Sequence, residues 1–204
     1  MSDHNCPNCG DRVPDQIRHI TMLTCPSCGT TLYVDGAQLH DAGNAGQMHD
    51  GPALFGVGDA VRLGKALIQI TGHARFSYGR GWWDEYWGFD EDQRGCWVSV
   101  DEGDVVLQYP IAKDFWPRVA RTARVGTPFR YRDDDWQVTE ADTAECVALR
   151  GSFGEQLEVG ETYTFLNASG PGGELLSGEF WEGGQSWYVG YWFDPFDVVV
   201  RVDT

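Results

Sequence analysis

The stretch WVSVDEGDVVLQY, residues 97–109, shows how most of this chain is built. It contains two short runs of β-branched and apolar residues, Trp97–Val100 and Val105–Tyr109, separated by the polar residues DEGD. Runs of this kind, alternating with Gly, Asp and Asn turns, are typical of antiparallel sheets. The stretch therefore predicts two strands joined by a turn.

The same pattern recurs through the chain beyond residue 55. The predicted strands are Leu67–Thr71, Tyr86–Phe89, Trp97–Val100, Val105–Tyr109, Trp136–Thr139, Tyr163–Leu166, Trp187–Phe193 and Val198–Val202. Residues 132–136 (RDDDW) are typical of a hairpin turn, and the one expected helix is Lys113–Arg124, which Pro117 limits to a turn or two unless that proline lies in the first turn. We therefore predict an all-β, mainly antiparallel domain over residues 56–204, arranged as a sandwich or a barrel.

Two parts of this domain resemble each other. Residues 57–110 and 125–204 both open with Val-Gly, at Val57-Gly58 and Val125-Gly126. Each later contains a strand rich in Trp and Tyr. Two similar sheet-forming halves are one interpretation, and the other is that aromatic strands recur in any β protein.

Composition narrows the classes of function. The chain has 31 acidic residues against 15 basic ones, a formal net charge of −16, which argues against a protein whose main work is binding a phosphate backbone. It has no apolar run long enough to span a membrane and no signal peptide at its start. We therefore expect a cytoplasmic protein without a transmembrane segment.

Four cysteines form two nearly identical motifs, Cys6-Pro-Asn-Cys9-Gly and Cys25-Pro-Ser-Cys28-Gly. Two C-x-x-C turns let four thiolates surround one ion, and zinc prefers four such ligands in a tetrahedron. The spacing predicts a structural Zn²⁺ site within a ribbon over residues 1–35, whose residues 11–24 form a hairpin. The alternatives are a redox C-x-x-C pair and an iron site of the same geometry.

The first 50 residues, which include the ribbon, are acidic, with six aspartates against Arg12 and Arg18. This charge favours a protein-docking or bracing role for the ribbon over nucleic-acid binding. Residues 36–55 are rich in Gly, Ala, Asp and His, and we expect a flexible linker there. The two other cysteines, Cys96 and Cys146, are most simply small buried hydrophobic residues.

From Gly56 onward a series of short motifs follows in a fixed order: Val57-Gly58-Asp59, Ile70-Thr71-Gly72, Trp83-Asp84-Glu85-Tyr86, Gly95-Cys96-Trp97-Val98, Val147–Gly151, Phe153-Gly154-Glu155, Gly160-Glu161, Leu176-Ser177-Gly178-Glu179 and Tyr188-Val189-Gly190. This order resembles a bacterial family known as domain of unknown function 4178, and the resemblance implies a bacterial protein. The N-terminal module is similar to zinc ribbons of the rubredoxin-knuckle type. The resemblance implies no established activity, ligand or catalytic residue.

One stretch combines aromatic rings with carboxylates. On a strand, Trp83, Glu85 and Trp87 share one face, while Asp84 and Tyr86 face the other side. Rings beside acids suit an organic cation, such as a polyamine, through cation–π contacts. The alternative is that these rings belong to the core and the acids to its solvated rim.

A basic segment interrupts the acidic domain between Lys113 and Arg132. Arg118, Arg121 and Arg124 recur at threefold spacing and would line one face of a short helix. Such a face could dock an acidic partner; the alternative is a solvated connector.

These observations favour a non-enzymatic adaptor or scaffold subunit that docks a protein partner. Nucleophilic catalysis needs a base beside the nucleophile, and His73 is the only histidine after residue 50, so we assign no catalytic residue. The first alternative is a binding module for a cationic small molecule, and the second is an enzyme that uses carboxylates.

Overall fold

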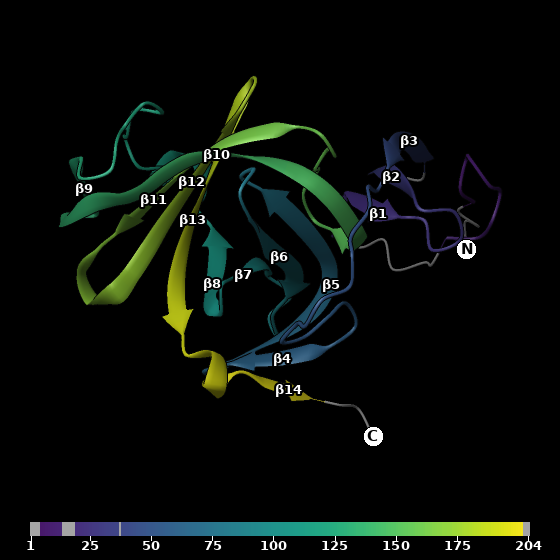
Figure 1. Ribbon diagram of the computed structural model, residues 1–204, viewed down its shortest axis with the longest axis horizontal. Coiled ribbons are helices and arrows are strands. Elements are labelled where there is room, and N and C mark those ends of the chain that lie inside the picture. Colours follow the sequence, from purple (N-terminus) through teal and green to yellow (C-terminus); the bar gives the residue numbers. More distant parts are fainter. Residues whose placement is uncertain (1–4, 14–18, 37, 202–204) are drawn as a thin grey trace.

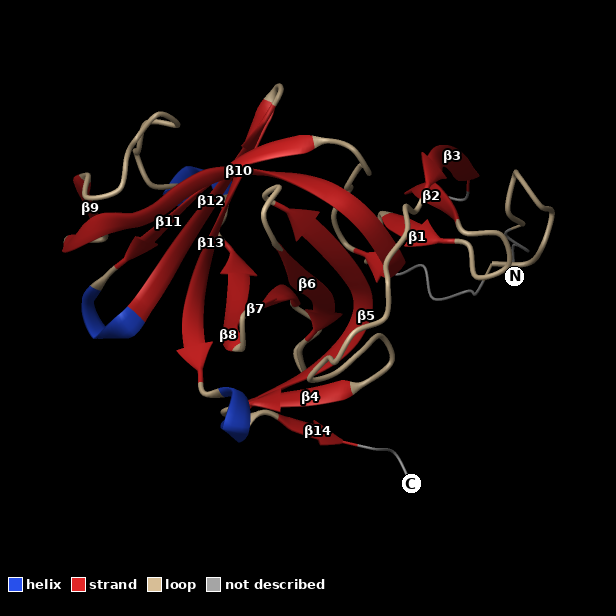
Figure 2. Ribbon diagram, in the orientation of Figure 1, coloured by secondary structure: helices blue, strands red, loops and turns tan. Residues whose placement is uncertain are grey.

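The protein is built almost entirely from antiparallel strands (Figures 1 and 2). The computed structural model describes residues 5–13, 19–36 and 38–201. Its strands are β1 (Met22–Thr24), β2 (Thr30–Asp35), β3 (Gln38–Asn44), β4 (Ala60–Leu63), β5 (Ala66–Ser77), β6 (Trp82–Phe89), β7 (Gly95–Asp101), β8 (Asp104–Pro110), β9 (Pro128–Tyr131), β10 (Asp134–Phe153), β11 (Thr162–Ser169), β12 (Glu174–Trp181), β13 (Gly184–Phe193) and β14 (Val199–Arg201). Helical structure in these residues is limited to the 3-10 turns η1 (Lys113–Phe115), η2 (Pro171–Gly173) and η3 (Pro195–Asp197), so none of it can cross a membrane.

The all-β prediction is therefore confirmed. Each predicted strand overlaps an observed one, although the last was predicted to end at Val202, which lies outside the described residues, as do residues 14–18 of the predicted ribbon hairpin. The tight turn between β9 and β10 falls where the sequence predicts it, with Arg132 and Asp133 at positive φ.

Eight of the strands close into a barrel (Figure 1). Their order is β5-β6-β7-β8-β13-β12-β11-β10, and β10 returns to pair with β5. Closure removes the free edges that an open sheet would expose. Of the two arrangements that the sequence allows, the structure has the barrel.

The closing pair depends on two glycines. Strand β10 pairs with β11 along Gln137–Glu145 and then with β5 along Cys146–Gly151, where Gly151 lies opposite Gly72. A Cβ atom on Gly151 would lie 2.2 Å from the carbonyl oxygen of Thr71, and Gly151 has φ +81°. The two strands can therefore approach this closely only because side chains are absent there.

The barrel strands, together with β4 and β9 beside them, form two similar halves, β4–β8 and β9–β13. Strand β4 pairs with β5 in the same register as β9 pairs with β10. In the first half the side chain of Gln69 donates to the carbonyl oxygen of Gly58, at 2.9 Å. In the second half Gln137 donates to Gly126, at 3.3 Å. The equivalent hydrogen bonds confirm the prediction of two similar halves.

The outer face of the barrel is apolar and covered. In the first half Ile70, Tyr86 and Val98 pack with Phe55 and with residues of β4 and β14. In the second half Leu176 and Trp187 belong to a cluster that residues 111–123 and β9 cover. Much of the hydrophobic burial therefore lies outside the barrel wall.

The inner face contains Trp83, Glu85 and Trp87. The ring of Trp83 on β6 lies 5.3 Å from that of Phe165 on β11. Strands β6 and β11 are not neighbours, so these rings meet across the barrel interior. Because side chains alternate along a strand, Glu85 and Trp87 face inward as well. The prediction that these three residues share one face agrees with this geometry.

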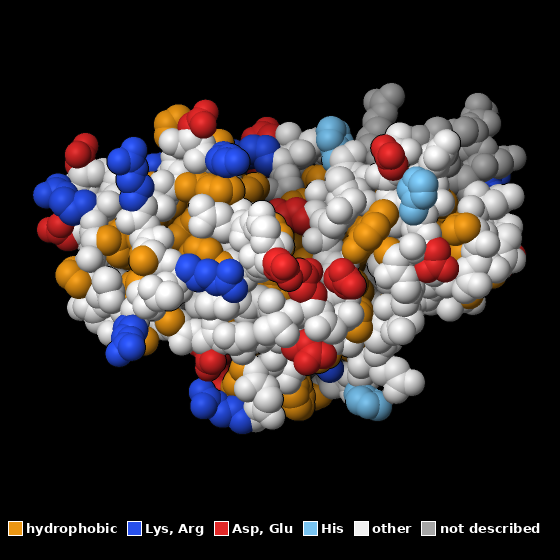
Figure 3. All heavy atoms as spheres, turned by 90° about the horizontal axis from the view of Figure 1, so that it is seen from above, with side chains coloured by type: hydrophobic (Ala, Val, Ile, Leu, Met, Phe, Trp, Pro, Cys, Tyr) orange, Lys and Arg blue, Asp and Glu red, His pale blue; other side chains and the backbone are white. Residues whose placement is uncertain are grey.

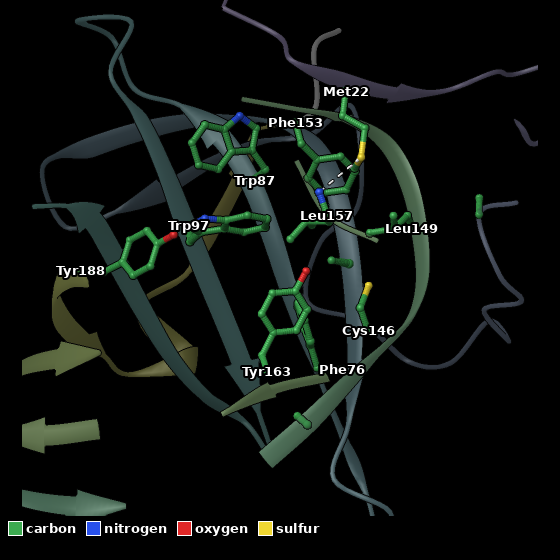
Figure 4. Close-up of a cluster of buried hydrophobic side chains, with 13 residues drawn as sticks. Met22, Phe76, Trp87, Trp97, Cys146, Leu149, Phe153, Leu157, Tyr163 and Tyr188 are labelled. Carbon is green, nitrogen blue, oxygen red and sulfur yellow. Dashed lines mark hydrogen bonds between the residues drawn. The ribbon is translucent and has the colours of Figure 1, made fainter. Parts of the chain in front are cut away.

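One end of the interior is filled by a hydrophobic cluster (Figure 4). The ring of Trp97 lies 5.0 Å from that of Trp87 and 5.9 Å from that of Phe153. Met22 of β1 belongs to the same cluster and is completely buried. The N-terminal module thus contributes to the barrel core.

Two sequence expectations differ from the structure. The predicted helix over Lys113–Arg124 is wrong, because only η1 is helical and the chain after it is irregular. Trp116 and Val119 are drawn onto the outer-face cluster, and the indole of Trp116 donates to the carbonyl oxygen of Ile111, at 2.8 Å. These contacts outweigh the weak helix signal.

The segment 36–55, expected as a linker, contains strand β3, which pairs with β2. The residues after it lie along the barrel. The amide of Leu149 donates to the carbonyl oxygen of Ala45, at 2.7 Å, and Arg150 pairs with Asp50, at 2.9 Å. Polar composition suggested a linker, but these main-chain and charged contacts hold the segment on β10.

The closing glycine provides a test of the barrel. We expect Gly151→Ala to destabilise the protein by at least about 2 kcal/mol, because it adds both backbone strain and a steric clash. Gly126→Ala is the matched control: Gly126 has φ +89° but nothing within 4 Å of the added Cβ, so about 1 kcal/mol is expected. Urea denaturation measures both, and equal losses would contradict this account of closure.

Candidate functional site

The two cysteine loops have the same backbone conformation. The amide of Gly10 donates to the carbonyl oxygen of Cys6, at 2.8 Å, and that of Gly29 to Cys25, at 2.9 Å. Both glycines have positive φ, at 79° and 73°. The repeated turn brings each pair of sulfurs to the same side of its loop.

The four sulfur atoms converge on one point. They all lie within 4.8 Å of one another, with 3.8 Å between Cys6 and Cys28 and 3.8 Å between Cys9 and Cys25. A tetrahedral ion with metal–sulfur bonds of about 2.3 Å requires an edge of about 3.8 Å. The cluster therefore fits a single four-coordinate metal ion.

Neighbouring polar groups support the thiolate form of one ligand. The hydroxyl of Thr30 lies 3.2 Å from the sulfur of Cys28, and the side-chain amide of Asn8 donates to Thr30, at 2.7 Å. Such outer contacts orient metal ligands. Cys96 and Cys146, by contrast, are buried in hydrophobic clusters, as the sequence suggests.

The metal module is joined to the barrel by strand pairing. Strand β1 pairs with the end of β10, with Met22 opposite Phe153, and the amide of Thr21 donates to the carbonyl oxygen of Phe153, at 2.9 Å. The hydroxyl of Tyr33 donates to Leu157, at 3.3 Å. The module therefore lies against one end of the barrel.

A second candidate site lies inside the barrel, in a cavity of about 230 Å³ that we call the acidic chamber. Its lining combines three aromatic rings, five carboxylates and several neutral side chains. They are Trp83, Phe165, Trp192, Glu85, Asp101, Asp104, Glu140, Glu179, Ser99, Ser177, Gln108, Asn167, Val106 and Leu175. Two of the residues predicted from sequence, Trp83 and Glu85, are in this lining, whereas Trp87 belongs to the packed cluster.

Glu85 is held in place by two hydrogen bonds. Its Oε1 atom accepts from the indole of Trp83, at 2.9 Å, and from the hydroxyl of Ser99, at 2.9 Å. Its Oε2 atom is buried and has no hydrogen-bond partner in the described part of the chain. Burial raises the pKa of Glu85 to about 7, although both hydrogen bonds favour the charged form.

Glu179 is the least compensated carboxylate. Within the described residues it has no hydrogen-bond or ion-pair partner, and it lines both this cavity and a second one. Burial, together with the nearby charges of Glu85 and Glu155, raises the pKa of Glu179 to about 8. A carboxylate in this position costs folding free energy when it ionises.

The neutral lining also presents unused acceptors. The side-chain oxygens of Gln108 and Asn167 are buried without a partner among the described residues. The amide nitrogen of Asn167 donates to Glu140, at 2.9 Å, which fixes the oxygen of Asn167 as the free group. Three buried oxygens of the lining, counting Oε2 of Glu85, thus lack a donor.

A second cavity, the second chamber, has a volume of about 710 Å³ and shares Glu179 with the first. Glu155 lines it and accepts a hydrogen bond of 2.7 Å from the hydroxyl of Tyr188. Burial raises the pKa of Glu155 despite this hydrogen bond. Thr21 and Tyr33 of the metal module form part of its wall.

The outer side of β6 has a different environment. Asp84 accepts from His73, at 2.8 Å, and from Arg75, at 2.8 Å, while the ring of His73 stacks on Tyr86, at 4.3 Å. His73 is thus held by a carboxylate that also neutralises an arginine. This arrangement braces the outer face.

The structure does not place the predicted arginines on a helix face. Arg118, Arg121 and Arg124 are exposed on the irregular segment, and Arg121 donates to the hydroxyl of Thr164, at 3.4 Å. On the face drawn in Figure 3, most of the visible Lys and Arg side chains lie in the half of the molecule that carries β9. The three arginines are exposed, but they do not line the acidic chamber.

Comparison with known proteins identifies the barrel. A family model described as "Domain of unknown function (DUF4178)" matches residues 56–195. The chain belongs to this family. No curated protein and no solved structure matches the chain.

The DUF4178 match covers β4 to β13 and stops before β14. It therefore includes both halves of the barrel and every residue that lines the acidic chamber. The metal module and β3 lie before it.

Sequence reasoning missed Glu155, Glu179, Gln108 and Asn167. A signal for one of them was present: in β12, Ser177 and Glu179 alternate with Leu176 and Phe180. That alternation places Glu179 opposite the apolar face, but it does not show that the polar face lies inside a barrel.

The cysteine cluster predicts metal binding. We expect the full chain to retain about one metal ion after dialysis, and Cys25→Ser to lose it, because three thiolates no longer complete the tetrahedron. Cys96→Ala is the control, since Cys96 lies in an outer-face cluster. Elemental analysis by mass spectrometry measures the ratio; metal retained by Cys25→Ser would contradict the assignment.

The interior carboxylates predict how stability depends on pH. The raised pKa means that the native state binds the Glu179 proton more tightly than the unfolded chain does. The resulting contribution to the free energy of unfolding is complete below about pH 4.5 and is lost as pH rises through about 8. Glu179→Gln should therefore match the native protein at pH 5 and exceed its stability by roughly 2–4 kcal/mol at pH 9. Urea denaturation at both pH values is the measurement, and equal stability at pH 9 would show that Glu179 is solvated.

Proposed function

We propose that the DUF4178 barrel binds a small organic cation in the acidic chamber. The observation that carries the proposal is the carboxylate of Glu179, which is enclosed by protein and lacks a partner within the described residues. An ammonium group placed beside it would supply the missing charge and hydrogen bonds. The proposal develops the first alternative drawn from the sequence.

The lining selects against other ligand classes. An anion would meet five carboxylates. A neutral polyol would supply no charge to the carboxylates of the lining once they ionise. The remaining buried groups of Gln108, Asn167 and Glu85 are all acceptors, and a ligand rich in N–H donors satisfies them.

The chain's own residues would share the work of recognition. Glu179 and Glu85 supply charge, and their ionisation is favoured by a bound cation. Trp83 and Phe165 present rings on which methylene groups and ammonium groups can pack, at about 0.5–2 kcal/mol for each cation–π contact. Trp192 is half exposed, at 50%, and lies at the mouth of the chamber.

The metal in the cysteine site is, in this proposal, Zn²⁺ with a structural role. Four thiolates in a tetrahedron are a preferred zinc environment, and all four positions are taken by protein. The ion would hold the two loops together. Because β1 and β2 flank the loop that contains Cys25 and Cys28, it would also help position Thr21 and Tyr33.

The adaptor function, the cytoplasmic location and the bacterial origin remain predictions. The exposed arginines Arg118, Arg121 and Arg124 are the surface on which a protein partner would be sought. Binding of a cation inside the barrel is compatible with a partner on that outer surface, because the two places are on different sides of the wall.

Calorimetric titration with putrescine at pH 8.5 and low salt tests the proposal. We expect saturable binding by the native chain and a loss of affinity of at least about tenfold for Glu179→Gln, because the buried charge is removed. Glu182→Gln is the matched control: it changes the net charge equally at an exposed position in the turn between β12 and β13.

Two outcomes would contradict the proposal. One is the absence of saturable heat with the native chain, and the other is equal affinity in both variants, which would indicate surface attraction only. Consumption of putrescine that depends on Glu179 would instead favour the carboxylate enzyme.

A further inference from the structure

The two chambers lie one after the other along the barrel interior. On β11, Tyr163 lines the second chamber, and Phe165 and Asn167 line the acidic chamber. On β12, Trp181 lines the second chamber, Ser177 lines the acidic chamber, and Glu179 lies between them and lines both. Neighbouring strands thus pass from one chamber to the other in the same order.

The second chamber also has unpaired acceptor chemistry. The hydroxyl of Thr21 is buried there without a partner among the described residues. Glu155 accepts side-chain hydrogen bonds from Tyr188 and Trp97, and burial still raises its pKa. Trp181 and Tyr163 contribute rings, and these rings lie 6.3 Å apart.

The carboxylates of the two chambers do not converge on one point. Among the described residues, only the four cysteines bring three or more ligand atoms close enough to hold a single ion. A compact metal ion therefore cannot satisfy Glu85, Glu179 and Glu155 together. An extended molecule with separated positive charges can.

We propose that the ligand is a linear polyamine that lies along the barrel interior, with one ammonium group in each chamber and Glu179 between them. This inference rests on the proposed cation-binding function and extends it to a second subsite. Glu85 is the acid at one end of the ligand and Glu155 is the acid at the other. The methylene chain lies against the aromatic rings of the lining.

The arrangement makes the metal module part of the binding site. Thr21 precedes β1, and Tyr33 lies on β2, so the far end of the ligand is enclosed by residues that the cysteine loops position. The hydrogen bond from Tyr33 to Leu157 fixes this wall to the barrel.

A ligand series distinguishes the subsites in the full-length, metal-loaded chain. Butylamine, putrescine, spermidine and spermine are titrated at pH 8.5 into the native protein, Glu85→Gln, Glu155→Gln and Glu182→Gln. Gln at position 155 can still accept the hydrogen bond from Tyr188, so folding is preserved, and a denaturation curve confirms it. Titration at two salt concentrations separates specific binding from charge attraction, which salt screens.

We expect affinity to rise about tenfold or more from butylamine to spermine in the native chain. Glu155→Gln should lower the affinity for spermine by about tenfold and leave the affinity for butylamine within about twofold of the native value. Glu85→Gln should lower the affinity for every amine. If butylamine binds as tightly as spermine, or if Glu155→Gln weakens all amines equally, the two-chamber inference is overturned while cation binding stands. If no amine binds, the proposed function fails with it.

Discussion

Closure of the barrel between β5 and β10 is the constraint on which the rest of the structure depends. One long strand, β10, pairs with β11 along its first part and with β5 along its second part. This change of partner is allowed by Gly72 and Gly151, whose backbones meet where side chains would collide. Without the closure, the inner face of the sheet would be an ordinary solvated surface, and burial would not raise the pKa of Glu85 or of Glu179.

Closure also explains why apolar side chains are buried on both sides of the barrel wall. On the outer face, Ile70 and Leu176 lie under covering segments, so the stabilisation from buried apolar surface does not require a filled interior. The interior is therefore free to hold acids and amides at one end and the Trp87–Trp97 cluster at the other. Buried carboxylates such as Glu85, Glu155 and Glu179 oppose folding when they ionise, and the proposed ligand binding would account for keeping them.

Much of the fold could be predicted from sequence, because it depends on local signals. The cysteine spacing places four sulfurs around one point, and the alternation in β6 places Trp83 and Glu85 on one face. The site could be predicted only in part. Glu179 and Glu155 are more than twenty residues apart in the sequence. The charges of Glu85 and Glu155 come near Glu179 only when strands from both halves form the closed barrel, and no local sequence pattern encodes that closure. The helix at 113–124 failed for the same reason, since contacts of Trp116 with distant residues decide its backbone.

The two-half architecture gives a physical reason for a site with two ends. Each half begins with a short hairpin that packs on its outer face, and each contributes inner-face acids: Glu85 from the first half, Glu155 and Glu179 from the second. The halves are alike in backbone but differ in their surroundings, because the metal module adds Met22 and Thr21 at only one end. A symmetric barrel would offer equivalent ends to a ligand. Thr21 and Tyr33 of the module form part of the wall at one end and the half-exposed Trp192 lies at the other, so the two ends of a bound linear cation would have different surroundings.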